Sequence, residues 1–274
     1  MKPDFRNGDA GVDQHSTPTE LAAAVARRVV FDEQARIRIA DFAVGSRALL
    51  EAAASRFHNA VLHGTDISES VLSDLRAARP SWKLRQCDFL DPVERARCDL
   101  TSGHKGYDAV LLNPPFSYRG NQSWRIRLDG SDVAASPAAA FVALASSLVG
   151  SGQLVAILPR STLTSDRDQP VWRALERQWT IAAVESYGRT TFPGIAARTV
   201  LVDLRCRARK KPTGRRREHT PAVARRPISV EIVRGARQCM PCARILAASL
   251  LSTRPDSAAT ACRFSASRTA AVGV

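Results

Sequence analysis

The chain has 274 residues, 45% of them apolar, which suits one α/β domain of about 200 residues plus an appendage. The first thirty residues lack an apolar stretch behind a basic start, and no run of about 18 apolar residues occurs. We therefore expect a cytoplasmic protein without a secretory signal or a membrane span. The formal charge of +14 and the isoelectric point near 10.5 favour a polyanionic partner.

Helical and strand patterns alternate along the chain from residue 20 to residue 204. Helices are predicted at 21–29, 48–54, 69–78, 138–149 and 171–179. Strands are predicted at 38–42, 60–66, 82–86, 107–112, 153–158, 181–186 and 198–204. Thr19 is expected to cap the first helix and Ser136 the fourth, which Gly150 and Gly152 end. The alternation predicts a Rossmann-like α/β fold, with a seven-stranded, mostly parallel sheet and helices on both faces.

The composition changes after this region, so we divide the chain into three parts. Residues 1–204 form the predicted α/β domain, and residues 205–227 form a basic linker. Ten Lys or Arg residues lie between positions 205 and 226 against the single acid Glu218, which fits either a solvated linker or a segment that grips phosphates. Residues 228–274 have weak periodicity and form a short appendage, either a poorly ordered tail or a truncated second domain.

The six cysteines are expected to be free thiols in a reducing cytosol. Cys239 and Cys242 form a C-x-x-C pair, but no second pair follows at the spacing of a zinc finger. We therefore predict no metal site.

Acidic residues follow the predicted strands in an order typical of nucleoside binding. Asp41 and Gly45 lie at the turn after the first strand, where a glycine permits close approach of a ligand and a carboxylate could pair with an ammonium group. Asp66 ends the second strand and could bind both hydroxyls of a ribose, or cap the next helix. Asp88 follows the third strand and could accept a hydrogen bond from an adenine amino group, or serve as a turn residue.

The segment Asn113-Pro114-Pro115-Phe116 is the most specific feature of the sequence. It follows a strongly apolar strand directly, and its two prolines remove two N–H donors and fix two φ angles. The result is a stiff corner in which the Asn113 amide and the free Pro114 carbonyl can hold a planar amino group. Phe116 can stack on the ring that carries this group. The alternative is a rigid turn without chemistry.

With these elements in this order, the sequence resembles the N6-adenine DNA methyltransferases with an NPPF motif, especially those of restriction–modification systems. The resemblance covers roughly residues 14–204. It includes a Thr-Pro motif at Gln14–Pro18, a glycine-bearing motif at Asp41–Leu50, a ribose motif at Gly64–Ile67, the pair Asp88-Phe89, the strand Gln153–Pro159, and Thr191–Pro193 with Arg198–Leu204.

The resemblance implies S-adenosylmethionine as cofactor and DNA as partner. The implied cofactor-binding residues are Thr17, Pro18, Asp41, Ala43, Gly45, Asp66, Ile67, Asp88, Phe89 and Asn113, and the implied catalytic residues are Asn113, Pro114, Pro115 and Phe116. The target adenine is flipped out of the duplex, Asn113 and Pro114 orient its amine, and Phe116 stacks on it. The nitrogen then attacks the sulfonium methyl group directly, without a metal or a covalent enzyme intermediate.

Two features depart from the family pattern. Arg47 stands where the family usually has a second glycine; it either strains or fills the cofactor site, or begins the helix and points to solvent. Phe42 and Val44 replace the usual Pro and Cys and are tolerable apolar exchanges.

Val230–Gly235 looks like the start of a DNA-reading domain, yet only about forty residues follow. A separate subunit then recognises the target DNA sequence, or the chain is a fragment.

The segment 117–132 beside the NPPF corner is predicted to be a loop that faces DNA, or else a mobile surface loop. Its candidate nucleic-acid contacts are Tyr118, Arg119, Trp124, Arg125 and Arg127. Two other functions remain open. One is methylation of RNA or of a protein glutamine, and the other is a catalytically impaired remnant that only binds nucleic acid.

Overall fold

The computed structural model describes residues 17–103, 106–116, 124–128, 130–187, 198–207 and, as backbone, 230–233. All of these ranges lie in the first compact unit of the chain, which ends at Gly235. Within the described ranges, no helix has the length and apolar character needed to cross a membrane.

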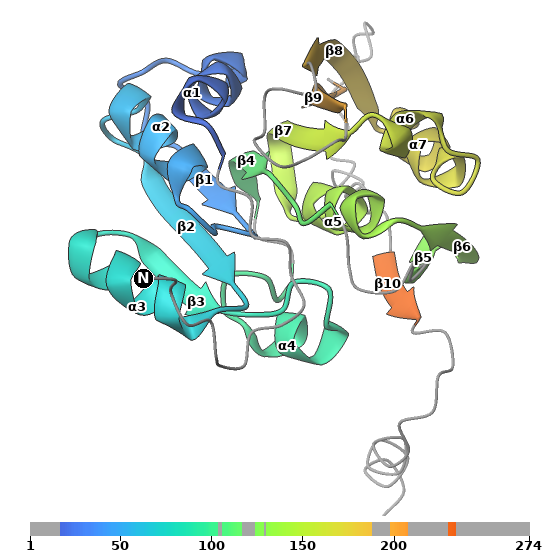
Figure 1. Cartoon of the computed structure of the whole chain (residues 1–274), viewed down its shortest axis with the longest axis horizontal. Helices are drawn as coiled ribbons and strands as arrows, with labels where there is room; N and C mark the ends of the chain where they lie inside the picture. Colours follow the sequence, from blue (N-terminus) through green and yellow to red (C-terminus); the bar gives the residue numbers. More distant parts are fainter. Residues whose placement is uncertain are drawn as a thin grey trace, which may run out of the picture. The chain divides into compact units, whose positions relative to one another are not determined.

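Seven strands form the central sheet in the order β3-β2-β1-β4-β7-β9-β8 (Figure 1). Their bounds are β1 Arg38–Asp41, β2 Val61–Asp66, β3 Lys83–Gln86, β4 Tyr107–Leu112, β7 Val149–Pro159, β8 Trp179–Tyr187 and β9 Thr199–Cys206. The pairs from β3 to β7 are parallel, and β9 is antiparallel to both of its neighbours. The predicted Rossmann-like sheet is confirmed. Its strand order reverses between β1 and β4, where α/β sheets commonly bind ligands.

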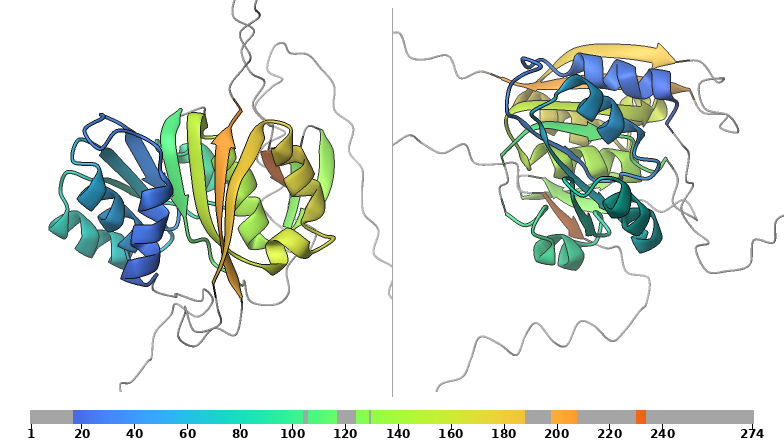
Figure 2. Two further views of the ribbon diagram at one scale, coloured as in Figure 1. Left: turned by 90° about the horizontal axis from the view of Figure 1, so that it is seen from above. Right: turned by 90° about the vertical axis from the view of Figure 1, so that its left-hand side faces the viewer.

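Helices cover both faces of the sheet, because its strands alternate apolar side chains between the two faces. In β7, Leu154, Ala156 and Leu158 pack in one hydrophobic cluster, and Val155 and Ile157 pack in the other. The helices are α1 Thr19–Arg28, α2 Ala48–Arg56, α3 Glu69–Ala78, α4 Pro92–Arg97, α5 Pro137–Ser146, α6 Ser161–Thr164 and α7 Gln169–Glu176. Helices α1 to α3 lie on one side and α5 to α7 on the other in Figures 1 and 2.

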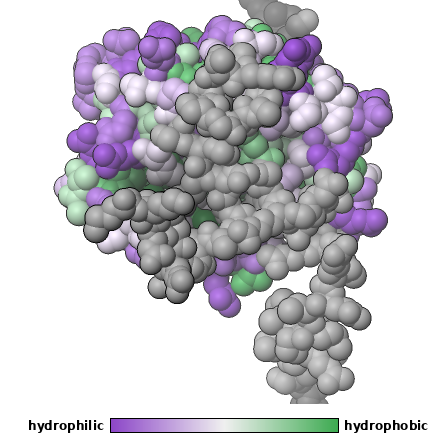
Figure 3. All heavy atoms as spheres, in the orientation of Figure 1, coloured by the Kyte–Doolittle hydropathy of each residue, from purple (hydrophilic) through white to green (hydrophobic). Residues whose placement is uncertain are grey.

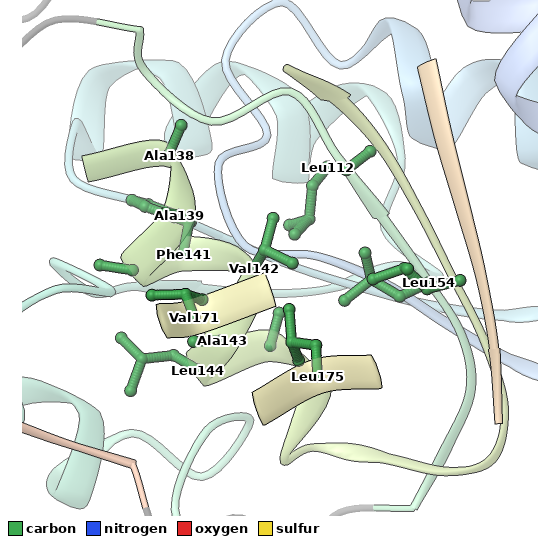
Figure 4. Close-up of a cluster of buried hydrophobic side chains, with 14 of the residues drawn as sticks. Leu112, Ala138, Ala139, Phe141, Val142, Ala143, Leu144, Leu154, Val171 and Leu175 are labelled. Carbon is green, nitrogen blue, oxygen red and sulfur yellow. The ribbon is translucent and has the colours of Figure 1, made fainter. Parts of the chain in front are cut away.

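All ten residues of helix α5 are buried, as expected for a helix that is apolar on every side. Figure 4 shows its side chains against those of β4, β7 and α7. A second sheet in the order β10-β5-β6 contacts the same helix, with β5 at Trp124–Leu128, β6 at Ser131–Ala135 and β10 at Val230–Val233. In the coloured parts of the face shown in Figure 3, hydrophobic residues lie in small groups between hydrophilic ones.

The small sheet corrects two predictions. Residues 124–128 and 131–132 are strands and not part of a loop, because β5 and β6 form an antiparallel hairpin. The appendage predicted from residue 228 begins with β10, which pairs with β5 inside the first compact unit. The predicted boundary at 204 also falls within β9. Residues 208–229 and the Cys239–Cys242 pair lie outside the described ranges.

Three local predictions were wrong. Thr19 is the first residue of α1 and not its cap, since Pro18 occupies that position without a side-chain hydrogen bond. Gly150 and Gly152 lie within β7 instead of ending a helix, and α5 already ends at Ser146. A Cβ atom at Gly152 would overlap the Asp108 carbonyl group, so the close approach of β4 and β7 requires glycine there.

A buried polar network anchors α1 to the sheet. The Gln153 amide donates to the Arg28 carbonyl at 2.6 Å and to Asp203 Oδ1 at 2.6 Å, and it accepts from the Val30 N–H at 2.9 Å. Arg28 also forms an ion pair with Glu185 on β8. The end of α1 is therefore fixed on β7, β8 and β9, which holds the segment that precedes this helix at the edge of the sheet.

Candidate functional site

A cavity of about 320 Å³ opens at the carboxyl ends of β1, β2, β3 and β4. The predicted residues that line it are Thr17, Asp41, Ala43, Gly45, Asp66, Ile67, Asp88, Phe89, Asn113, Pro114, Pro115 and Phe116. Pro18 is the N-cap of α1 and does not line this cavity. The lining residues that were not predicted individually are Phe42, Val44, Ser46 and Leu49, which lie in the glycine-bearing motif, and Val71, Cys87 and Phe141. Phe42, Val44 and Cys87 are apolar side chains next to predicted residues, whereas Val71 comes from α3 and Phe141 from α5.

The glycine turn after β1 is tied to the end of β2. Gly45 has a φ of +45° and donates its N–H to Asp66 Oδ2 at 2.7 Å. The Val44 N–H donates to the Thr65 carbonyl at 3.0 Å. A Cβ atom at Gly45 would have room, since it would lie 3.7 Å from the Ala43 carbonyl oxygen. The backbone conformation, and not lack of space, therefore favours glycine at this position.

Asp66 holds two loops at the cavity. Asp66 is 8% exposed, and its Oδ1 accepts from the Ser68 N–H at 2.9 Å while its Oδ2 accepts from the Gly45 N–H. It does not cap α3, because the Ser68 hydroxyl accepts from Val71 at the N-cap. A carboxylate has about four lone-pair sites, so these two hydrogen bonds leave acceptor capacity for hydroxyl groups of a ligand.

Asp41 is a buried acid at the end of β1. Its Oδ1 accepts from the Ala43 N–H at 2.9 Å. The pKa of Asp41 is raised to about 7: burial is the main cause, the Ala43 hydrogen bond opposes it, and the charge of Asp66 adds to the rise. A cation placed in the cavity would reverse this shift, because it stabilises the carboxylate form.

Asp88 and a group of aromatic rings form another wall. The Asp88 carboxylate accepts from the Leu90 N–H at 2.9 Å, and its backbone N–H donates to Glu94 at 2.6 Å. The Phe42 and Phe89 rings are stacked with centroids 4.5 Å apart, and Phe141 lies 5.1 Å from Phe89. Phe42, which replaces the usual proline, is therefore part of an aromatic wall that suits a flat ligand.

The NPPF corner begins where β4 ends. Asn113 Nδ2 donates to the Thr17 hydroxyl at 2.8 Å. Asn113 Oδ1 is buried and has no hydrogen-bond partner among the described residues. Pro114 is buried, and Phe116 packs against the cluster that contains α1 to α3. A buried carbonyl oxygen without a donor is costly unless a ligand supplies one, so Asn113 is well suited to receive an N–H group.

Arg47 is strained but does not fill the cavity. Its φ is +63°, in the left-handed region, and it occupies the N-cap position of α2. Its side chain is 50% exposed and lies 3.7 Å from Glu51. It is not among the residues that line the cavity of about 320 Å³. Both parts of the sequence interpretation thus apply: the backbone is strained, and the side chain points to solvent.

Replacing Arg47 with glycine is expected to raise the free energy of unfolding by about 1 kcal/mol, because glycine adopts a positive φ without the cost of a Cβ atom. Urea denaturation monitored by circular dichroism would measure the change. Arg47→Ala is the matched control, since alanine keeps the Cβ atom and should give no such gain. Equal effects of the two substitutions would show that the backbone at residue 47 is not strained.

The structure describes only some of the residues that were predicted to contact nucleic acid. Tyr118 and Arg119 lie outside the described residues. Trp124 is 9% exposed and packs in the cluster around α5, so its predicted stacking on DNA is contradicted by its burial in β5. Arg125 is exposed, and Arg127 pairs with Asp132 at 2.8 Å. Within the described part of the chain, no group of three His, Cys, Asp or Glu residues could hold a metal ion.

Comparisons with known proteins support the fold. No family model and no curated protein matches the sequence. A solved structure from Listeria monocytogenes, assigned as a class I S-adenosylmethionine-dependent methyltransferase, matches with a TM-score of 0.54 and 15% identity over 73% of this chain and 64% of that one. This chain thus spans less than two thirds of the Listeria protein.

A structure from Pyrococcus horikoshii, assigned as an RNA methyltransferase, matches with a TM-score of 0.50 and 14% identity, covering 74% of this chain and 93% of that one. At such identities the likeness concerns the fold alone. The chain has the Rossmann-like fold found in class I S-adenosylmethionine-dependent methyltransferases.

Proposed function

We propose that this protein transfers a methyl group from S-adenosylmethionine to the N6 amine of a flipped-out adenine in DNA, within a restriction–modification system. The observation that carries the proposal is the NPPF corner. Asn113 opens into the same cavity as Asp41, Asp66 and Asp88, and its amide oxygen is buried without a donor among the described residues.

The polar and apolar side chains that line the cavity match the chemical groups of S-adenosylmethionine. Asp66 has remaining acceptor capacity for the two ribose hydroxyls, and Asp88 lies beside the aromatic wall that suits the adenine ring. Ile67 adds an apolar side chain that is 46% exposed. Asp41 would pair with the ammonium group. The cofactor supplies an electrophilic methyl group on a sulfonium sulfur.

On the acceptor side, the chain's own residues orient the nucleophile. Asn113 Oδ1 and the Pro114 carbonyl would accept the two N–H groups of the adenine amine. These hydrogen bonds would draw the nitrogen lone pair out of conjugation with the ring, so that it could form the new N–C bond while the bond from sulfur to the methyl group breaks and S-adenosylhomocysteine leaves with the electron pair. One amine proton would then pass to water. Phe116 would stack on the base. Alignment of the two reactants is the main contribution of the enzyme.

Binding of DNA is supported by charge. The chain carries +14, and ten of its basic residues lie between positions 205 and 226. Arg125 is exposed on β5, the strand that follows the NPPF corner after seven undescribed residues. With Tyr118 and Arg119 it remains a candidate contact to DNA. We propose that a separate subunit contributes to recognition of the target sequence.

The affinity for S-adenosylmethionine is expected to rise with pH up to about 7. Burial raises the pKa of Asp41 to about 7, so below that pH the acid is protonated and must lose a proton to pair with the ammonium group. The dissociation constant should fall by about tenfold per pH unit below pH 7 and level off above it. Calorimetry between pH 5.5 and 7.5 would measure this dependence. An equally steep dependence in Asp41→Asn would exclude Asp41 as the titrating group.

The substrate class is tested by offering unmethylated DNA, RNA and a protein extract to the purified chain with tritium-labelled cofactor. The proposal predicts that label enters DNA, and that Asn113→Ala abolishes this incorporation. Label in RNA or in a protein glutamine would favour the other methyltransferase functions. DNA binding without any transfer would favour the non-catalytic remnant.

A further inference from the structure

The hydroxyl of Thr17 joins two parts of the site that are 96 positions apart in the sequence. It accepts a hydrogen bond from Asn113 Nδ2 at 2.8 Å. Thr17 is 7% exposed and lines the cavity together with Asn113. It lies directly before α1, whose other end is held by Gln153 and by the Arg28–Glu185 ion pair. The position of the hydroxyl is therefore set by an anchored helix.

The orientation of the Asn113 amide decides what it can recognise. With Nδ2 held by Thr17, Oδ1 is the atom left without a partner among the described residues, and it can accept an N–H group. If the amide were flipped so that Oδ1 and Nδ2 exchanged positions, the NH₂ group would face the cavity in place of Oδ1. Two N–H donors would then face the amine of the target base, which is unfavourable.

A hydroxyl can accept or donate, so a second partner is needed to fix its direction. When Thr17 accepts from Asn113, its own hydrogen remains for an acceptor in the cavity. The carboxylate of the proposed cofactor is such an acceptor, and it can only receive a hydrogen bond. A hydroxyl that donates to a carboxylate must accept from Asn113, which fixes Oδ1 as the free atom of the amide.

We propose that Thr17 is a positioning residue that orients the Asn113 amide for the target amine. This inference rests on the proposed function and adds a role to Thr17 besides contact with the cofactor. Thr17 then links occupation of the cofactor site to recognition of the target base, because the same hydroxyl serves both groups.

The test compares Thr17→Val, which keeps the shape but lacks the hydroxyl, with Thr17→Ser, which keeps the hydroxyl. Methylation of unmethylated genomic DNA is measured at saturating cofactor. We expect kcat to fall about tenfold to 100-fold in Thr17→Val and to stay within about threefold of the wild type in Thr17→Ser. Equal kcat in Thr17→Val and wild type would overturn the proposal. A loss in Thr17→Ser as large as in Thr17→Val would also overturn it, since the hydroxyl would then not be the group that matters.

A second readout does not depend on activity. The side-chain NH₂ signals of Asn113 in a ¹⁵N–¹H correlation spectrum, identified by their absence in Asn113→Ala, are recorded with S-adenosylhomocysteine bound. They should shift in Thr17→Val and stay near the wild-type positions in Thr17→Ser. If they are identical in all three proteins, Thr17 does not orient the amide. If they shift as expected but the wild type methylates nothing, the proposed function fails and the hydrogen bond stands.

Discussion

Replacing Asn113 with alanine is expected to lower kcat for adenine methylation by about 100-fold or more. The substitution removes the buried oxygen that, in our proposal, accepts from the target amine. Loss of one preorganised polar group that acts on the reacting atoms typically costs about 100-fold to 1,000-fold in kcat. The fold should persist, because the Pro114-Pro115 corner and the apolar strand β4 remain.

Steady-state kinetics with labelled cofactor would measure this effect, and Asn113→Asp is the matched control. Aspartate keeps an oxygen acceptor at the same place, so it should retain more activity than alanine. If alanine and asparagine supported similar kcat values, the amide would not take part in catalysis. If both variants lost all activity and also unfolded at lower urea concentrations, the residue would be structural.

Replacing Asp66 with alanine is expected to weaken cofactor binding by about 100-fold or more, because two hydrogen bonds from the ligand to a charged acceptor would be lost. The same substitution leaves the N–H groups of Gly45 and Ser68 without their acceptor. Leaving these partly buried donors without an acceptor should lower the free energy of unfolding by about 1 kcal/mol. Calorimetry with S-adenosylmethionine and urea denaturation would measure the two effects separately.

Asp74→Ala is the control for this experiment. Asp74 is exposed on α3, one turn beyond the cavity-lining Val71, so its loss should change neither quantity appreciably. Asp66→Asn should fall between wild type and alanine, since an amide keeps one acceptor oxygen. Unchanged cofactor affinity in a folded Asp66→Ala protein would contradict the assignment of this cavity as the cofactor site.

Much of the fold could be predicted because its strands are either continuous apolar runs or end in recognisable residues. Parallel strands buried on both faces read as runs such as Tyr107–Leu112, and their carboxyl ends meet at one edge of the sheet. Asp41 and Asp66 end β1 and β2, Asn113 follows β4, and Asp88 follows the more exposed strand β3. Their convergence on one cavity therefore follows from the topology.

The hairpin β5–β6 was missed although its signals are present. Trp124, Ile126 and Leu128 alternate with Arg125 and Arg127, which is the period of a half-buried strand, and Asp129-Gly130 is a favoured turn pair. The arginines and the aromatic were instead interpreted as contacts to nucleic acid. Since the apolar side chains of β5 pack on α5, Trp124 is a core residue, whereas Arg125 is exposed and the Arg127 side chain is 42% exposed.

Other features could not be predicted because they depend on contacts between distant segments. β10 pairs with β5 across about a hundred residues, and Thr17 bonds Asn113 across 96 positions. Neither contact produces a pattern in the local sequence from which it could be predicted. The role of Arg47 could be predicted only in part. The sequence identified position 47 as unusual, but the positive φ and the exposed side chain are needed to show that the backbone is strained and that the side chain does not fill the cavity.

The most direct measurement is the identity of the methylated nucleoside. Unmethylated genomic DNA is incubated with the purified chain and methyl-deuterated S-adenosylmethionine, digested to nucleosides and analysed by mass spectrometry, with Asn113→Ala in parallel. We expect deuterated N6-methyladenine with the wild type and at least about 100-fold less with Asn113→Ala. Label on cytosine, equal label with both proteins, or no labelled nucleoside from a protein that binds the cofactor would contradict this expectation.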